Sequence, residues 1–227
     1  MKEVIKIVGV GGITNQMLPY LIEKYPEAKL ILIDGDKYEK KNKERQPFAQ
    51  VGANKAIVTA SALSAQGVEA TGIPSYITPE NVGVLVGPGD TVFLAVDNHK
   101  TRNIVDTHCE RNLSDILLVS GGNELKDGNV SVFWRKDGVS ITPPLAHFHP
   151  EIASPTDKGP FEQGCLALSR SHPQIAETNR MVGLAMIEAY ADIVSGNPTM
   201  EIYVSIEPEM QRKILPQERG WKHVSRN

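Results

Sequence analysis

A short β-branched run, Val4–Val8, leads directly into the glycine-rich turn Gly9-Val10-Gly11-Gly12. Residues 14–24, which follow this turn, carry apolar side chains at helical spacing. Glycines at such a junction allow a tight turn and a close approach of the backbone to a ligand. The amides at the start of the following helix can hold a phosphate group. This opening predicts either the strand, turn and helix of a nucleotide-binding α/β fold or a turn that needs glycine and binds nothing.

The same alternation of elements continues along the chain. Strand patterns are followed by helical ones, and the apolar strand runs are continuous rather than alternating, as is typical of parallel strands covered on both faces. Strands are predicted at 30–33, 70–74, 91–96 and 116–120, and helices at 54–65, 79–86 and 100–111. We therefore expect an α/β fold with a Rossmann-like, mostly parallel sheet and helices on both faces.

Beyond residue 129 the pattern changes. Segments 130–134 and 139–142 predict a hairpin, 175–193 a helix and 201–206 a strand, so antiparallel strands should extend the sheet in the C-terminal third. We expect one domain over 1–227, with a nucleotide-binding half at 1–122. The other half, 123–227, would hold these strands, a crossover loop at about 143–164 and the C-terminal helix. A loop of that length is usually functional or mobile.

Bulk properties exclude several classes of protein. A formal net charge of −3 gives no general attraction to nucleic acid or to an anionic membrane. No apolar run approaches the roughly 20 residues that span a bilayer, and Met1 leads straight into a strand pattern without a signal peptide. The two cysteines, Cys109 and Cys165, support neither a disulfide framework nor a four-thiolate zinc site. We therefore expect a cytoplasmic protein.

Asp34 ends the second predicted strand, where a carboxylate can accept the ribose hydroxyls of an adenosine. In the dinucleotide-binding fingerprint a third glycine or alanine would stand at Thr14, and its absence counts against a nicotinamide dehydrogenase. The segments after Asp34 are more specific. They read Asp36, then Asn42-Lys43-Glu44-Arg45-Gln46, then Gly52-Ala53-Asn54-Lys55, and after the strand at 91–96 Asp97-Asn98-His99-Lys100-Thr101-Arg102.

In this order and spacing the four blocks resemble the ThiF/MoeB family of ubiquitin-activating-like adenylyltransferases, over roughly residues 4–122. The resemblance implies that ATP and Mg²⁺ are used to activate a carboxylate. It assigns catalytic roles to Arg45, Lys55 and Asp97, with Asp97 holding the Mg²⁺ and Asp34 the ribose. The nucleotide site that it implies comprises Gly9, Gly11, Gly12, Asp34, Asp36, Asn42, Arg45, Gln46, Lys55, Asp97, Asn98 and Arg102. Taken singly, these residues also fit a solvated surface and structural ion pairs.

The chain departs from the family where many members carry two Cys-x-x-Cys pairs. Cys165 looks like the remnant of the first pair, with Leu168 in place of the second thiol, and no later pair exists. Structural zinc needs about four ligands, so we expect none here. Cys165 is then either the thiol acceptor of the activated group or a small buried hydrophobe. His147, His149 and His172 suggest a metal site less well than a solvent-exposed loop.

The resemblance implies that the partner is a small ubiquitin-like or sulfur-carrier protein, whose C-terminal glycine supplies the carboxylate. This carboxylate would become an acyl-adenylate with release of pyrophosphate. The resemblance also implies a homodimer. One alternative is a non-catalytic nucleotide-binding or interaction module of the same fold. Another is an NAD-dependent oxidoreductase, which would share only Gly9, Gly11 and Asp34 with these motifs.

Overall fold

The computed structural model describes residues 3–39, 50–124, 126–157 and 176–206, together with the backbone of 213–215 and 224–225. Its strands are β1 (Val4–Val8), β2 (Lys29–Ile33), β3 (Ala70–Ile73), β4 (Thr91–Leu94), β5 (Ile116–Asn123), β6 (Asp127–Lys136), β7 (Val139–Ser140), β8 (Glu201–Ser205), β9 (Lys213–Leu215) and β10 (Val224–Ser225). Its helices are α1 (Gly12–Lys24), α2 (Lys55–Ser64), α3 (Val82–Leu85), α4 (His99–Asn112), α5 (Pro150–Ala153) and α6 (Ala176–Val194), with a 3-10 turn η2 (Leu145–His147).

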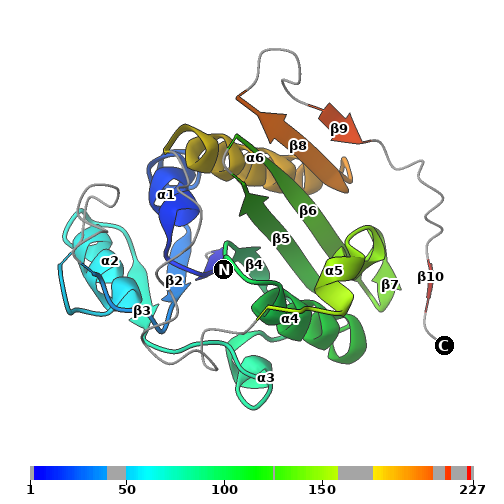
Figure 1. Cartoon of the computed structure of the whole chain (residues 1–227), viewed down its shortest axis with the longest axis horizontal. Helices are drawn as coiled ribbons and strands as arrows, with labels where there is room; N and C mark the ends of the chain where they lie inside the picture. Colours follow the sequence, from blue (N-terminus) through cyan, green and yellow to red (C-terminus); the bar gives the residue numbers. More distant parts are fainter. Residues whose placement is uncertain are drawn as a thin grey trace.

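The described strands form one sheet in the order β10-β7-β6-β5-β4-β1-β2-β3, and β8 pairs with both β6 and β9 (Figure 1). From β3 to β5 all neighbours are parallel, whereas β6 and the later strands pair antiparallel. Strands β2 and β3 lie on one side of β1, and β4 and β5 lie on the other. The chain therefore reverses its direction across the sheet between β1 and β4, which is the topological switch point of a doubly wound sheet. The Rossmann-like, mostly parallel sheet with an antiparallel C-terminal extension is thus confirmed.

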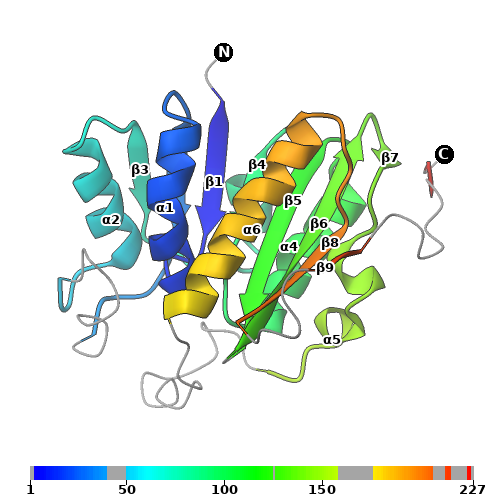
Figure 2. The ribbon, with the colours of Figure 1, turned by 90° about the horizontal axis from the view of Figure 1, so that it is seen from above.

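Helices cover both faces of the sheet (Figure 2). Helices α1, α2 and α6 pack over one face on a core that includes Leu18, Ala60 and Met186. Helices α3, α4 and α5 cover the other face on a second core that includes Val82, Val105 and Ile152. Among the described helices, none combines the length and the apolar character needed to cross a membrane.

Strand β5 is longer than the strand predicted at 116–120, because it continues through Gly121 and Gly122 to Asn123. A Cβ on Gly121 would lie 2.4 Å from Sδ of Met186, and a Cβ on Gly122 would lie 2.7 Å from a guanidinium nitrogen of Arg102. The two glycines therefore let α6 and α4 approach opposite faces of the strand, and they do not terminate it.

The described part of the predicted crossover loop, residues 143–157, contains regular secondary structure. It contains η2 and α5, which both pack against α4. The carboxylate of Asp106 on α4 accepts hydrogen bonds from the amides of Leu145 (2.9 Å) and Ala146 (3.0 Å). Burial raises the pKa of Asp106 to about 6, although these two bonds act in the opposite direction. The segment leading into the crossover is thereby fixed to one helix.

Candidate functional site

The turn between β1 and α1 leaves one side of its backbone open. Gly9 has φ +91°, and a Cβ there would lie 2.6 Å from the carbonyl oxygen of Ala95, so only glycine fits. A Cβ on Gly11, by contrast, would meet nothing within 4 Å. Gly11 precedes the first residue of α1, where backbone amides lack intrahelical partners. The turn therefore offers an accessible cradle for an anion at the start of a helix.

Thr14, which stands where the dinucleotide fingerprint has glycine, fits this turn without crowding it. Its side chain is fully buried, and Oγ1 donates a 2.6 Å hydrogen bond to the carbonyl oxygen of Gly9. One residue further, Nδ2 of Asn15 donates to the carbonyl oxygen of Gly11 at 2.8 Å. These two side chains bind carbonyl oxygens of the turn and leave the amides of Gly11 and Gly12 out of their hydrogen bonds.

Asp34 ties the end of β2 to this glycine turn. Its Oδ2 accepts from the amide of Val10 at 2.6 Å, and its Oδ1 accepts from the amide of Asp36 at 2.7 Å. Burial raises the pKa of Asp34 to about 6, while the nearby charge of Lys55 lowers it. Both oxygens already serve backbone amides, so contact with a ribose stays a prediction.

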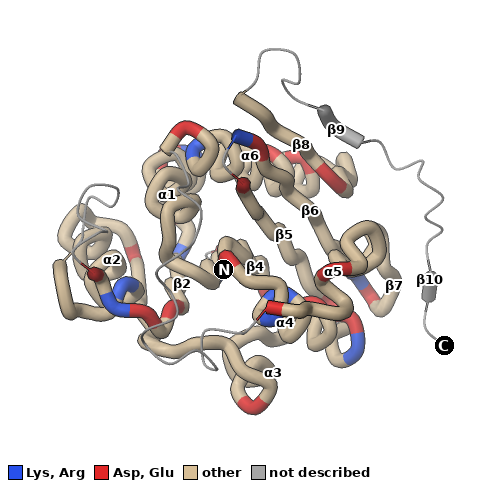
Figure 3. Tube along the Cα trace, viewed as in Figure 1, with Lys and Arg blue, Asp and Glu red and all other residues tan. Residues whose placement is uncertain are grey.

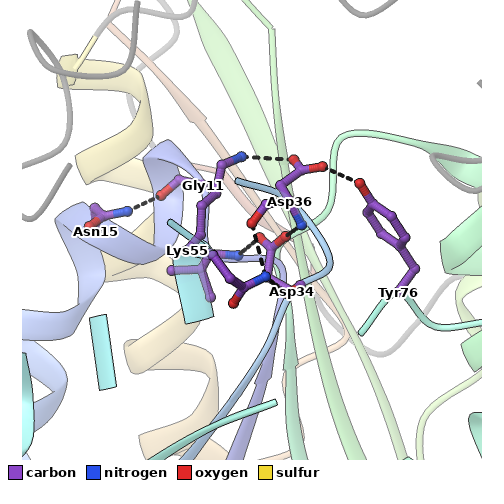
Figure 4. Close-up of polar contacts among 8 residues, drawn as sticks. Gly11, Asn15, Asp34, Asp36, Lys55 and Tyr76 are labelled. Carbon is purple, nitrogen blue, oxygen red and sulfur yellow. Dashed lines mark hydrogen bonds and ion pairs between the residues drawn. The ribbon is translucent and has the colours of Figure 1, made fainter. Parts of the chain in front are cut away.

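Asp36 is the meeting point of a lysine and a tyrosine. Nζ of Lys55 lies 2.8 Å from Oδ2 of Asp36, and the hydroxyl of Tyr76 donates to Oδ1 at 2.6 Å. Figure 4 shows the two side chains approaching Asp36 from opposite sides. Burial alone would lower the pKa of Lys55, but the carboxylates of Asp34 and Asp36 raise it above its ordinary value. Lys55 is thus held as a cation beside the turn.

Asn54 fixes the geometry of this ion pair. Its Nδ2 donates to the carbonyl oxygens of Asp34 (2.8 Å) and Asp36 (3.0 Å), and its Oδ1 caps α2 by accepting from the amide of Ile57. The start of α2 is therefore pinned to the end of β2, which brings Lys55 to Asp36. Figure 3 shows acidic and basic segments side by side at this place.

Tyr76 is not among the site residues predicted from the sequence. Its ring lies directly over the backbone of Gly35, where a Cβ would come within 2.5 Å of the ring. Tyr76 follows β3, the strand beside β2, at the same edge of the sheet. The signal available in the sequence was an aromatic residue placed shortly after β3, since β3 lies beside the strand that ends at Asp34.

Asp97 follows β4 and has an exposed side chain, and its charge acts on the pKa of both Lys55 and Arg102. Asn98 is the N-cap of α4, accepting from the amide of Thr101 at 2.8 Å. Arg102 is buried, and its Nη2 donates to the carbonyl oxygens of Val96 (2.8 Å) and Gly121 (3.0 Å). Asn98 and Arg102 thus support the loop that carries Asp97.

The other predicted residues are placed as follows. Gly12 starts α1 against the side chain of Asn179, which a Cβ would meet at 2.4 Å. Asn42, Arg45, Gln46 and Cys165 lie outside the described residues. Within the described ranges, no group of three His, Cys, Asp or Glu side chains is arranged to hold a metal ion. His147 packs edge-on against Phe148, and His149 pairs with two glutamates.

A glycine turn at the switch point of a doubly wound sheet, bordered by Asp34, Lys55 and Asp97, is typical of Rossmann-like nucleotide-binding domains. A protein-family model described as the ThiF family matches residues 2–212. The chain therefore belongs to the ThiF family.

The chain is also similar to one curated protein and to several solved structures. The chain is 32% identical over 132 residues to a sulfur carrier protein adenylyltransferase of Thermus thermophilus, which covers 56% of this chain and 48% of that protein. Among solved structures, E. coli MccB superposes with a TM-score of 0.69 at 19% identity, over 96% of this chain and 63% of that one. E. coli MccB with AMPCPP and MccA gives a TM-score of 0.69 at 18% identity, over 96% and 64%. The chain thus spans about half the length of the curated relative, and the MccB structures show the likeness of fold.

Proposed function

We propose that the chain is an ATP-dependent adenylyltransferase that converts a carboxylate into an acyl-adenylate. Membership of the ThiF family and the relation to a sulfur carrier protein adenylyltransferase support this activity. The observation that carries the proposal is the convergence of three features at one sheet edge. These are the open turn at Gly11, the partly buried cation Lys55 and the exposed carboxylate Asp97. They follow or adjoin β1, β2 and β4, whose carboxyl ends meet at the switch point.

The residues fit MgATP in the following way. The amides of the turn at Gly11 and Gly12 would face phosphate oxygens, and Asp34 and Asp36 would lie toward the ribose. The exposed carboxylate of Asp97 is a ligand type that Mg²⁺ prefers, and the ion would neutralise charge on the phosphates. We assign Asn42, Arg45 and Gln46 to the phosphates on the strength of the family pattern alone.

In the proposed reaction an oxygen of the substrate carboxylate attacks the α-phosphorus of ATP. The bond between the α-phosphorus and the bridging oxygen breaks, and pyrophosphate leaves with that electron pair. Negative charge grows on the departing group, and a preorganised cation stabilises such charge most strongly in a site shielded from water. Lys55 supplies that cation if it moves from Asp36 to the phosphates. Arg45 would add a second cation able to bind two phosphate oxygens.

We further propose that the carboxylate is the C-terminal glycine of a small ubiquitin-like or sulfur-carrier protein. The curated relative, named for a sulfur carrier protein, supports this class of substrate. A homodimer and the use of Cys165 as a thiol acceptor belong to the same proposal. Both rest on the family pattern.

Pyrophosphate exchange tests the activity. Purified protein, MgATP, labelled pyrophosphate and candidate tails ending in Gly-Gly should move label into ATP only when a carboxyl partner is present. Asp97→Ala should abolish the exchange, whereas Glu23→Ala, on an exposed position of α1, should leave it unchanged. Exchange that survives in Asp97→Ala would remove Asp97 from the site.

The same experiment distinguishes the adenylyltransferase from the main alternative, a non-catalytic module of the same fold. ATP binding without exchange for any tail would favour that module. Failure to bind ATP at all would overturn the nucleotide site itself. Membership of the ThiF family favours the adenylyltransferase over an NAD-dependent oxidoreductase.

A further inference from the structure

Three buried polar side chains lie in a line across the C-terminal part of the sheet. The strand register places Ser120 of β5 opposite Ser131 of β6, and Ser131 opposite Glu201 of β8. Neighbouring strand residues Val130 and Ile202 belong to the core under α6, so this polar row occupies the opposite face, where α4 and α5 lie. The three residues are 2%, 6% and 2% exposed.

His149, the residue before α5, closes over one end of the polar row. Its Nε2 lies 2.6 Å from Oε1 of Glu201 and 3.3 Å from Nδ2 of Asn129, and its Nδ1 lies 3.0 Å from Oε1 of Glu151. The hydrogen bond to Glu201 raises the pKa of His149 against the effect of burial. One oxygen of Glu201 is therefore occupied by an imidazole.

The other carboxylate oxygen of Glu201, Oε2, is not bound by the imidazole of His149. Within the described chain Oε2 of Glu201 and Oγ of Ser120 are buried without a hydrogen-bond partner. The same holds at the start of α4 for Oγ1 of Thr101 and Nε of Arg102. Buried polar atoms in proteins nearly always have a partner, and those that lack one indicate a water molecule or a ligand. The polar row and the start of α4 thus leave places open for partners from outside the chain.

The charges around the unpartnered oxygens of Ser120 and Glu201 favour a cation. Burial lowers the pKa of Arg102, and the carboxylates of Asp97, Asp157 and Glu151 act in the opposite direction, so all three lie near its guanidinium. With Glu201 this makes four carboxylates, against the positive charges of Arg102 and of a protonated His149. An unpaired buried carboxylate oxygen is costly, and a positively charged donor is the group that satisfies it best.

We propose that the polar row Ser120–Ser131–Glu201 binds the ammonium group of a lysine side chain in the substrate's C-terminal tail. This inference rests on the proposed function. Asp97 follows β4, which is three strand spacings from β8, or about 14 Å. An extended tail advances about 3.3 Å per residue, so the lysine stands about four residues before the carboxyl terminus. The polar row is then a specificity determinant for the tail.

A binding experiment tests the cation site without any turnover. The probe is n-propylammonium, and the readout is the NMR signals of the histidine rings, with His149 assigned through His149→Gln. We expect a saturable shift of the His149 signals in the wild type, about tenfold weaker binding in Glu201→Gln, and no change in the exposed control Glu27→Gln. Equal shifts with uncharged n-propanol, or equal binding by Glu201→Gln, would mean that ordered water satisfies these atoms and that the proposal is wrong.

A second experiment places the lysine in the tail. Six-residue peptides ending in Gly-Gly carry one lysine or one norleucine at each earlier position, and pyrophosphate exchange gives KM for each. We expect lysine about four residues from the end to lower KM about tenfold in the wild type and not in Glu201→Gln. Exchange that ignores lysine overturns the polar row as a tail determinant while the proposed function stands. If no peptide supports exchange, the proposed function fails for these tails, and n-propylammonium binding still decides the cation site.

Discussion

Two polar clusters border the same sheet, and they differ in how far the chain satisfies them. At the proposed nucleotide site the carboxylates of Asp34 and Asp36 are bound by backbone amides, Lys55 and Tyr76. Along the polar row, Oγ of Ser120 and Oε2 of Glu201 have no partner within the described residues. In the first cluster the carboxylate oxygens already have partners within the chain, so a ligand that binds these carboxylates has to replace existing hydrogen bonds or ion pairs. The second offers contacts that a ligand would complete.

This difference has a physical consequence for binding. Lys55 is already paired with Asp36, so a phosphate competes with that carboxylate, and part of the attraction between Lys55 and the nucleotide offsets the weakened ion pair. In the polar row a donor gains a hydrogen bond without breaking one, because the penalty for burying Oε2 of Glu201 is already present in the folded protein. We expect the nucleotide site to be rigid before binding and the polar row to gain stability on binding.

The largest expected effect is on catalysis at the proposed nucleotide site. Lys55→Ala removes the partly buried cation, and we expect the rate of pyrophosphate exchange to fall by about 10²–10³. The matched control is Lys24→Ala, at an exposed position in the last turn of α1, which should exchange at the wild-type rate. An unchanged rate in Lys55→Ala would show that the ion pair with Asp36 is only structural.

The next effect concerns the turn that the nucleotide would use. Gly9→Ala should lower the free energy of unfolding by about 3 kcal/mol, because the residue has a positive φ and its new Cβ would strike the carbonyl of Ala95. Gly89→Ala, also at positive φ but with nothing within 4 Å of the new Cβ, should cost only about 1 kcal/mol. Urea denaturation measures both. Equal losses would mean that the contact with Ala95 is not what requires glycine.

Removing one hydroxyl group from each cluster compares how much the two hydroxyls contribute to the stability of the fold. Tyr76→Phe removes a bond to a carboxylate and should destabilise the fold by about 1.5 kcal/mol. Ser120→Ala removes a hydroxyl that has no partner in the described chain and should change stability by about 0 kcal/mol or increase it slightly. Thermal and urea unfolding give both values. A loss in Ser120→Ala as large as that in Tyr76→Phe would contradict the contrast between the clusters.

The smallest effect is a pH dependence in the polar row. The pKa of His149 is raised in the folded protein, so its bond with Glu201 contributes stability that is fully present below the unfolded pKa, about 6.5. That contribution is lost as the pH rises through the folded pKa. Wild type should therefore exceed His149→Gln by about 1 kcal/mol more at pH 6 than at pH 9. Glu201→Gln should shrink this pH dependence, since the bond to Glu201 is its largest cause.

The sequence alone was sufficient for the order of elements and for placing several residues of the proposed nucleotide site at strand ends. Continuous apolar runs predict parallel strands because both faces are covered, and this is what the sheet from β3 to β5 shows. Asp34, Lys55 and Asp97 each follow or adjoin a strand end, so their gathering at one edge follows from parallel topology. The roles assigned to Asn42, Arg45 and Gln46 remain predictions.

Other features depend on contacts between residues far apart in the chain. Gly121 and Gly122 look like a strand end, and only the approach of Met186 and Arg102 explains why β5 runs through them. Tyr76 reaches Asp36 because β3 lies beside β2. Side-chain hydrogen bonds of this kind have no local pattern.

What the sequence by itself determined is the family, the α/β architecture and the chemistry of the strand ends, since each depends on short-range periodicity and on motif spacing. Only the tertiary structure decided which polar atoms are satisfied. Ser120, Ser131 and Glu201 are neighbours through strand register alone, and register is set by the antiparallel pairing of β5, β6 and β8. Whether a buried oxygen has a partner depends on every element that packs around it, and that information exists only once the chain has folded.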